Sequence, residues 1–184
     1  MKRLLFLISV IFFVGALTIS AQDKEDYSKY PGYVDFGNLA PFMNSENMTE
    51  VNIEGYLLKM VSNMSEKNDP ELSSLLKGLK LVKVYSFKVS GNDAKEVSGK
   101  IDQIDKRLSD KDWNRIVKVK GAHENTNVYI KTTTDQNNIV GLVVTSLEKD
   151  GEAAFVNIVG SIDMEAIGRL GNKFDIPSLE KIHK

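Results

Sequence analysis

The chain of 184 residues has no cysteine, and its 24 lysines and arginines nearly balance its 25 aspartates and glutamates, for a formal net charge of −1. The missing cysteine excludes disulfides, thiolate catalysis, thiolate metal ligands and lipid attachment at a signal-peptide cysteine. The near-neutral charge gives no long-range attraction to nucleic acid or to anionic lipid, so we expect neither as a partner.

The chain opens with the layout of a secretory signal peptide, residues 1–21. Two basic residues precede an apolar run, residues 4–17, and small residues then lead to Ala21 and Gln22. This order is typical of an exported protein. The apolar run is shorter than the roughly 20 residues that a membrane-spanning helix needs. We therefore expect cleavage between Ala21 and Gln22 and no membrane span after it, with an uncleaved anchor as the alternative.

The rest of the chain divides into a leader and one domain. Residues 22–44 begin with a polar, charged stretch and are expected to form a flexible leader, with a candidate edge strand over residues 33–36. Residues 45–184 are long enough to bury a core and are expected to form a single α+β domain.

Apolar periodicity predicts the first half of this domain. A short strand around Val51 and Ile53 is followed by two amphipathic helices, which are separated by residues 68–70. A strand rich in β-branched and aromatic residues follows over residues 81–89. The third helix has the clearest period, because four apolar residues recur on one face: Val97, Ile101, Ile104 and Leu108.

Four further strands are predicted in the second half: residues 113–120, 125–133, 138–147 and 152–160. Short polar connections favour hairpins, so these strands should form an antiparallel meander. Ser161 or Asp163 should then cap a short helix. The resulting fold class is α+β, an antiparallel sheet with amphipathic helices packed mainly on one face.

The sequence offers only weak candidates for chemistry. His123 precedes a glutamate, but a zinc-protease helix needs a second histidine at position 127, which is asparagine. Asp102 and Asp105 lie one helical turn apart, so they could work as an acid–base pair, although a solvated helix face is the commoner reading. We therefore predict no catalytic residue, no metal site and no cofactor.

Two surfaces of the predicted sheet are notable. Arg115, with Lys118 and Lys120, makes a small basic spot on one strand, which a solvated strand face also explains. The strand over residues 138–147 is apolar on both sides, so one side needs a second cover. If that side is exposed, a docking surface should contain three residues: Tyr129, Ile139 and Val143.

Several segments together resemble a known family over roughly residues 45–180. They are residues 75–79, 82–85, Trp113, 141–143, 155–163 and 167–170. The pattern resembles the bacterial envelope family called domain of unknown function 4252, DUF4252, and its most specific part is residues 156–170. The resemblance implies a secreted or outer-envelope protein and supplies no activity. Some relatives look like lipoproteins, but this chain lacks the required cysteine, which favours a free periplasmic protein.

Taken together, these features predict an exported periplasmic or envelope protein that binds another envelope protein, a peptide or another envelope component without catalysis. A hydrolase that uses carboxylates alone, such as Asp102 and Asp105, is one alternative. A structural subunit of an envelope assembly is another. The sequence leaves the ligand and the oligomeric state open.

Overall fold

The computed structural model describes residues 25–42, 48–122 and 124–162. The expected signal peptide with its cleavage site at Ala21 and Gln22 lies outside the described residues, as do His123 and the helix expected after Ser161.

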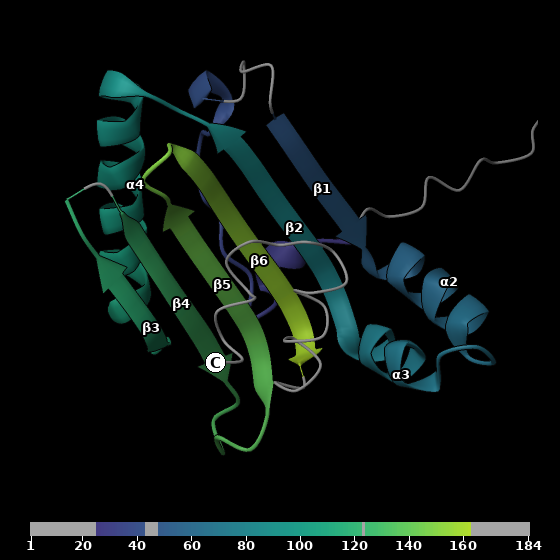
Figure 1. The fold of residues 1–184 in the computed structure, drawn as a ribbon. Helices are drawn as coiled ribbons and strands as arrows, with labels where there is room; N and C mark the ends of the chain where they lie inside the picture. Colours follow the sequence, from purple (N-terminus) through teal and green to yellow (C-terminus); the bar gives the residue numbers. More distant parts are fainter. Residues whose placement is uncertain (1–24, 43–47, 123, 163–184) are drawn as a thin grey trace, which may run out of the picture.

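Six strands form one antiparallel sheet with the order β1-β2-β6-β5-β4-β3 (Figure 1). The strands are β1 (Met48–Glu54), β2 (Leu79–Lys88), β3 (Asn114–Lys120), β4 (Asn125–Thr132), β5 (Ile139–Leu147) and β6 (Glu152–Ile162). The last four run as the predicted meander, and β6 then pairs with β2. The predicted α+β class with an antiparallel sheet is confirmed.

Three α-helices lie in the described part of the chain: α2 (Gly55–Ser65), α3 (Pro70–Gly78) and α4 (Gly91–Ser109). Asp69 caps α3, because its carboxylate accepts a 3.0 Å hydrogen bond from the Leu72 N–H. Among the described residues, no helix is long and apolar enough to cross a membrane.

Alternating side chains of the sheet build two buried clusters, one on each face. The first contains the apolar side of α4 and large strand residues such as Phe87 and Phe155, and we call this side the α4 face. The second contains Leu142 and Val156 together with leucines of α2 and α3. The longest helix thus covers the α4 face, while the two short helices contribute to the opposite cluster.

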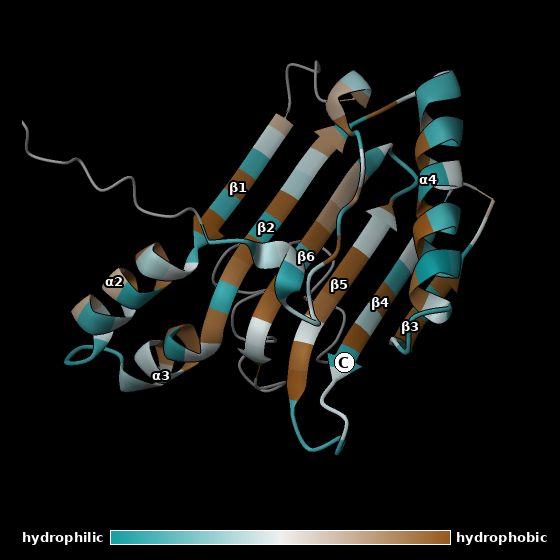
Figure 2. Ribbon diagram, turned by 180° about the vertical axis from the view of Figure 1, so that it is seen from behind, coloured by the Kyte–Doolittle hydropathy of each residue, from teal (hydrophilic) through white to brown (hydrophobic). Residues whose placement is uncertain are grey.

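The segment expected to be a flexible leader instead packs on the α4 face over residues 25–42. Val34, Phe36 and Leu39 are all buried in the first cluster. The ring of Phe36 meets that of Phe155 edge to face at 5.5 Å. Figure 2 shows this segment on the same side of the sheet as α4. The expectation of a flexible leader rested on the polar residues before residue 33. It overlooked Val34, Phe36 and Leu39, which the sheet buries.

Residues 33–36 do not form the expected edge strand, because a side chain of the sheet takes the place of a partner strand. The amide oxygen of Asn157, which is fully buried, accepts a 2.9 Å hydrogen bond from the Val34 N–H. The amide nitrogen of Asn157 donates to the carbonyl oxygens of Gly32 at 2.9 Å and Leu142 at 3.2 Å. One asparagine therefore joins this segment to the centre of the sheet.

The N-terminal segment crosses β5 at a point where the segment and the strand each need a glycine, Gly32 and Gly141. A β-carbon on Gly141 would lie 2.5 Å from the Gly32 Cα and 2.8 Å from Cη2 of Trp113. Trp113 itself is buried in the first cluster. The close backbone approach lets the segment lie flat on the sheet.

Candidate functional site

The docking surface expected at Tyr129, Ile139 and Val143 does not form. Tyr129 and Val143 are 1% and 0% exposed and belong to the cluster beneath α4. Ile139 packs against the cluster of the opposite face, because the β5–β6 register shifts between Ile139 and Gly141. This irregularity breaks the alternation that the sequence suggested. The three side chains are therefore neither exposed nor on one face.

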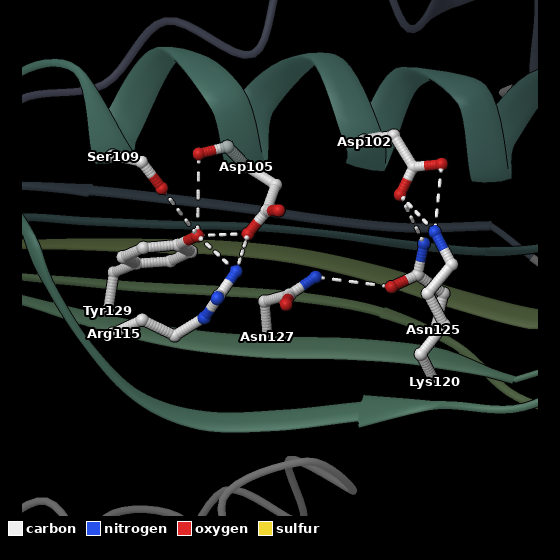
Figure 3. Close-up of polar contacts among 8 residues, drawn as sticks. All are labelled: Asp102, Asp105, Ser109, Arg115, Lys120, Asn125, Asn127 and Tyr129. Atoms are coloured by element: carbon white, nitrogen blue, oxygen red, sulfur yellow. Dashed lines mark hydrogen bonds and ion pairs between the residues drawn. The ribbon is translucent and has the colours of Figure 1, made fainter.

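A polar seam instead joins α4 to β3 and β4 (Figure 3). At one end, the carboxylate of Asp105 accepts hydrogen bonds from the Tyr129 hydroxyl and from Nη1 of Arg115, the latter at 2.6 Å. Nη1 of Arg115 also donates to the Tyr129 hydroxyl oxygen at 3.2 Å. Arg115 and Tyr129 face each other across the β3–β4 pair, so strand register brings both to the helix.

The other end of the seam is built in the same way around Asp102. Its carboxylate accepts hydrogen bonds from Nζ of Lys120 at 3.0 Å and from Nδ2 of Asn125 at 3.1 Å. Asn127 lies between the two ends and donates to Oδ1 of Asn125 at 3.2 Å. Its own Oδ1 is buried and has no hydrogen-bond partner within the described residues. The two aspartates that the sequence singled out thus hold α4 to the sheet.

The electrostatics of the seam favour an ionised Asp105. Burial by itself raises the pKa of this carboxyl group, but hydrogen bonds from Tyr129 and Arg115 and the positive charges of Arg115 and Lys118 outweigh it, so the pKa is lowered. Burial and the neighbouring Asp105 raise the pKa of the Tyr129 hydroxyl. Because its pKa is lowered, Asp105 is ionised near neutral pH and has no proton to donate there as a general acid.

The described residues contain no group of three or more His, Cys, Asp or Glu side chains that could hold a metal ion. The seam does open into a pocket of about 670 Å³ between the first half of α4 and the turns that follow β3 and β5. Asp102, Lys120 and Asn125 belong to both. The pocket has charged side chains of both signs, including Lys95 and Asp150, so its charge favours neither an anion nor a cation.

An apolar surface lies far from the seam, on α2. Four of its large side chains are exposed, and we call them the α2 stripe: Tyr56, Met60, Val61 and Met64. Tyr56 is 63% and Met64 is 74% exposed. The buried side of this helix consists of Leu58 and Ser62. The Ser62 hydroxyl donates to the Ser73 carbonyl at 2.9 Å, which turns this side toward α3.

Sequence reasoning missed the partners of the two aspartates. The basic spot on β3 was visible, and Asn127 and Tyr129 alternate with apolar residues on β4. Tyr129 donates to Asp105, and Asn127 donates to Asn125, which in turn donates to Asp102. Only the packing of α4 across β3 and β4 brings them together, and periodicity within each element does not contain that information.

The fold and its surfaces define a class of protein: an α+β protein with one antiparallel sheet, a helix that is tied to the sheet by paired charges, and an exposed apolar stripe on a second helix. Residues 42–170 match the model of the family described as a domain of unknown function, DUF4252. The chain belongs to this family, which confirms the resemblance. No curated protein and no solved structure matches the chain.

Proposed function

We propose that this protein is an exported, non-enzymatic interaction module of the bacterial cell envelope, which docks an acidic amphipathic segment of another envelope protein on the α2 stripe. The observation that carries the proposal is the exposure of four large apolar side chains on one short helix. Exposed apolar side chains that gather on one surface are typical of interaction sites, whereas scattered ones are ordinary. Met60 and Met64 also adapt well to different partner surfaces.

Charge around the stripe favours an acidic partner. Lys59 lies within α2 next to Met60, and Lys67 lies in the turn that follows the helix. Three lysines and one glutamate line a hollow of about 340 Å³ beside Tyr56: Lys59, Lys77, Lys80 and Glu25. Because Lys77 also pairs with Glu66 at 2.9 Å, Lys59 and Lys80 carry the excess positive charge there. A second copy is a poorer fit, because a twofold pairing of α2 helices would bring the lysines near the stripe of one copy close to those of the other. Acidic side chains flanking an apolar face would complement both features.

The non-enzymatic part of the proposal is supported by the use of the two aspartates. Each carboxylate contacts a basic side chain, Lys120 for Asp102 and Arg115 for Asp105. A hydrolase that works by carboxylates alone needs one of them protonated at its working pH. The pKa of Asp105 is lowered, which favours the ionised form and does not meet that requirement.

Export is proposed from the layout of residues 1–21 and from the envelope location that the family resemblance implies. The test is the intact mass of the protein recovered from the periplasm of a two-membrane bacterium that expresses the full chain. We expect a mature chain that begins at Gln22. A chain that keeps Met1 and stays with the inner membrane would contradict this part of the proposal.

The docking proposal is tested with a synthetic helical peptide that has leucines on one side and glutamates along both flanks. The control peptide carries lysines in place of the glutamates. We expect fluorescence anisotropy to show binding of the acidic peptide only, and the variant Met60→Ser/Met64→Ser to weaken it about tenfold or more, since each methionine buried in an interface contributes roughly 1.5–3 kcal/mol.

The matched control variant is Ile116→Ser, which removes an exposed apolar side chain of β3, away from α2. It should leave peptide binding unchanged. Equal binding of both peptides, or equal loss in both variants, would reject the α2 stripe as the docking surface.

A further inference from the structure

The two edges of the sheet are complementary to each other. We propose that β1 of one copy of this chain pairs with β3 of the next, so that the protein assembles head to tail through a continuous antiparallel sheet. This inference concerns a different surface from the α2 stripe and depends neither on a partner docking there nor on export.

Both edge strands are open on their outer side. In Figure 1, β1 and β3 are the outermost strands of the sheet, and each pairs with a single strand within the described residues. Each is seven residues long, and both are mostly exposed. The two edges also carry exposed large apolar side chains: Ile116 and Val119 on β3, and Met48 on β1. An open edge strand carries unpaired backbone groups that can hydrogen-bond to another strand.

Strand direction allows the sheet to continue across the two copies. The sheet has six strands, and every neighbouring pair is antiparallel, so β1 and β3 run in opposite directions. A second copy placed in the same orientation therefore brings its β1 antiparallel to β3 of the first. The α4 faces of both copies then lie on the same side of the extended sheet.

The side chains of the two edges match on the α4 face. Glu50 of β1 lies opposite Tyr85, which packs on the first cluster, so the Glu50 and Glu54 side chains share the α4 face. On β3, Lys118 and Lys120 lie opposite Asn127 and Asn125, which belong to the seam on that face. One edge is therefore acidic and the other basic on the same side of the sheet.

The opposite face matches as well. Val51 and Ile53 of β1 pack against the second cluster, as does Val117 of β3, and Val119 alternates with Val117 on that face. One antiparallel register places Val51 opposite Val119 and Ile53 opposite Val117. The same register places Glu50 opposite Lys120, which also contacts Asp102 of its own chain, and places Glu54 beside the irregularity at Arg115–Val117. Cross-strand pairs of these kinds, apolar with apolar and acidic with basic, stabilise a sheet.

Pairing of like edges is opposed by charge. Two β1 edges would bring glutamates together, and two β3 edges would bring lysines together. Within the described residues, Glu50, Glu54 and Lys118 form no ion pair of their own, so their charges are available to a neighbouring copy. The contact is therefore heterologous and extends into an open chain or closes into a ring. The competing explanation is that the charged side chains prevent edge-to-edge pairing, and in that case the protein is a monomer.

Sedimentation velocity over a range of concentrations tests the proposal. We expect the wild-type chain to sediment faster as its concentration rises. The variant Glu50→Lys/Glu54→Lys reverses the charge of the β1 edge, and Lys118→Glu reverses that of the β3 edge. Each variant alone should self-associate about tenfold or more weakly, because it places like charges across the contact. Circular dichroism and the urea midpoint check that each variant is folded.

An equimolar mixture of the two variants is the decisive measurement. Mixing restores opposite charges at both kinds of contact, so we expect association to return to near the wild-type level. A variant that is merely misfolded would not be rescued. Lys106→Glu, a charge reversal on the exposed side of α4, is the matched control and should behave like the wild type.

Cross-linking tests the register directly, because the chain has no cysteine of its own. In the variant Val51→Cys/Val119→Cys, we expect oxidation to produce a ladder of disulfide-linked oligomers, while Thr49→Cys/Val119→Cys should form them much more slowly. A wild-type chain that stays monomeric at every concentration would overturn the proposal. So would an assembly that the edge variants leave unchanged.

Discussion

Asp105 shows how one residue acquires its role from its neighbours. From the sequence it formed a symmetrical pair with Asp102 on the exposed side of a helix. In the structure, the Asp105 side chain is only 20% exposed and is held by Arg115 and Tyr129, whereas the Asp102 side chain is 50% exposed. The difference arises because β4 places the large ring of Tyr129 under the second half of α4 and smaller asparagines under the first.

We expect Asp105→Asn to destabilise the protein by roughly 1–2 kcal/mol at pH 6, because it removes a partly buried ion pair. The pKa of Asp105 is lowered in the folded chain, so its stabilising effect is complete above the unfolded pKa, about 3.9, and disappears as the pH falls through the folded pKa. Urea denaturation at several pH values should therefore show the gap between wild type and variant shrinking below about pH 4.

Glu96→Gln removes an exposed carboxylate of the same helix and serves as the control. Its stability should follow the wild type at every pH. A gap for Asp105→Asn that stays constant down to the lowest pH would contradict the proposed ionic role of Asp105.

Two glycines show how the same residue type differs between elements. Gly99 lies in the middle of α4, where a β-carbon would meet no atom within 4 Å. Gly141 lies in β5, where a β-carbon would be only 2.5 Å from the Gly32 Cα. The first glycine weakens its helix without a steric reason, and the second is required by the segment that crosses the strand.

We expect Gly99→Ala to stabilise the protein by about 0.5–1 kcal/mol, because alanine restricts the unfolded chain and favours the helix. The matched variant Gly141→Ala should destabilise it by about 1–3 kcal/mol, because neither the Gly32 backbone nor Trp113 can move away cheaply. Thermal unfolding followed by circular dichroism measures both. Equal effects of the two variants would mean that the crossing at β5 is not close-packed.

On the scale of the whole molecule, the N-terminal segment is part of the fold. Its apolar side chains fill the part of the α4 face that the helix leaves open, and Asn157 connects its backbone to β6 and β5. The matched family region begins at residue 42, so the segment lies before it. The chain therefore extends its core beyond the region that defines the family.

We expect a chain that begins at residue 43 to be less stable than one that begins at residue 25 by about 3 kcal/mol or more. The shorter chain exposes the apolar surface that Val34, Phe36 and Leu39 cover, and burial of each is worth roughly 1.5–3 kcal/mol before the cost of ordering the segment. Urea denaturation of both chains measures the difference. Equal midpoints would show that the segment contributes nothing to the folded domain.

Periodicity within single elements was enough to predict the helix of Val97, Ile101, Ile104 and Leu108 and the four-stranded meander. These features depend on neighbours a few residues apart, so the sequence contains their cause. A strand over residues 81–89 was also expected, and β2 forms there, but its place beside β6 was not expected, because that pairing joins distant parts of the chain.

The sequence by itself determined the main helices and strands of residues 48–162 and the absence of thiol chemistry. Only the tertiary structure decided which faces are exposed: it buried Tyr129 and Val143, turned Met60 and Met64 outward, and paired the two aspartates with residues of β3 and β4. The reason is that local preferences act through the covalent chain, whereas burial and charge pairing depend on where distant elements meet in space.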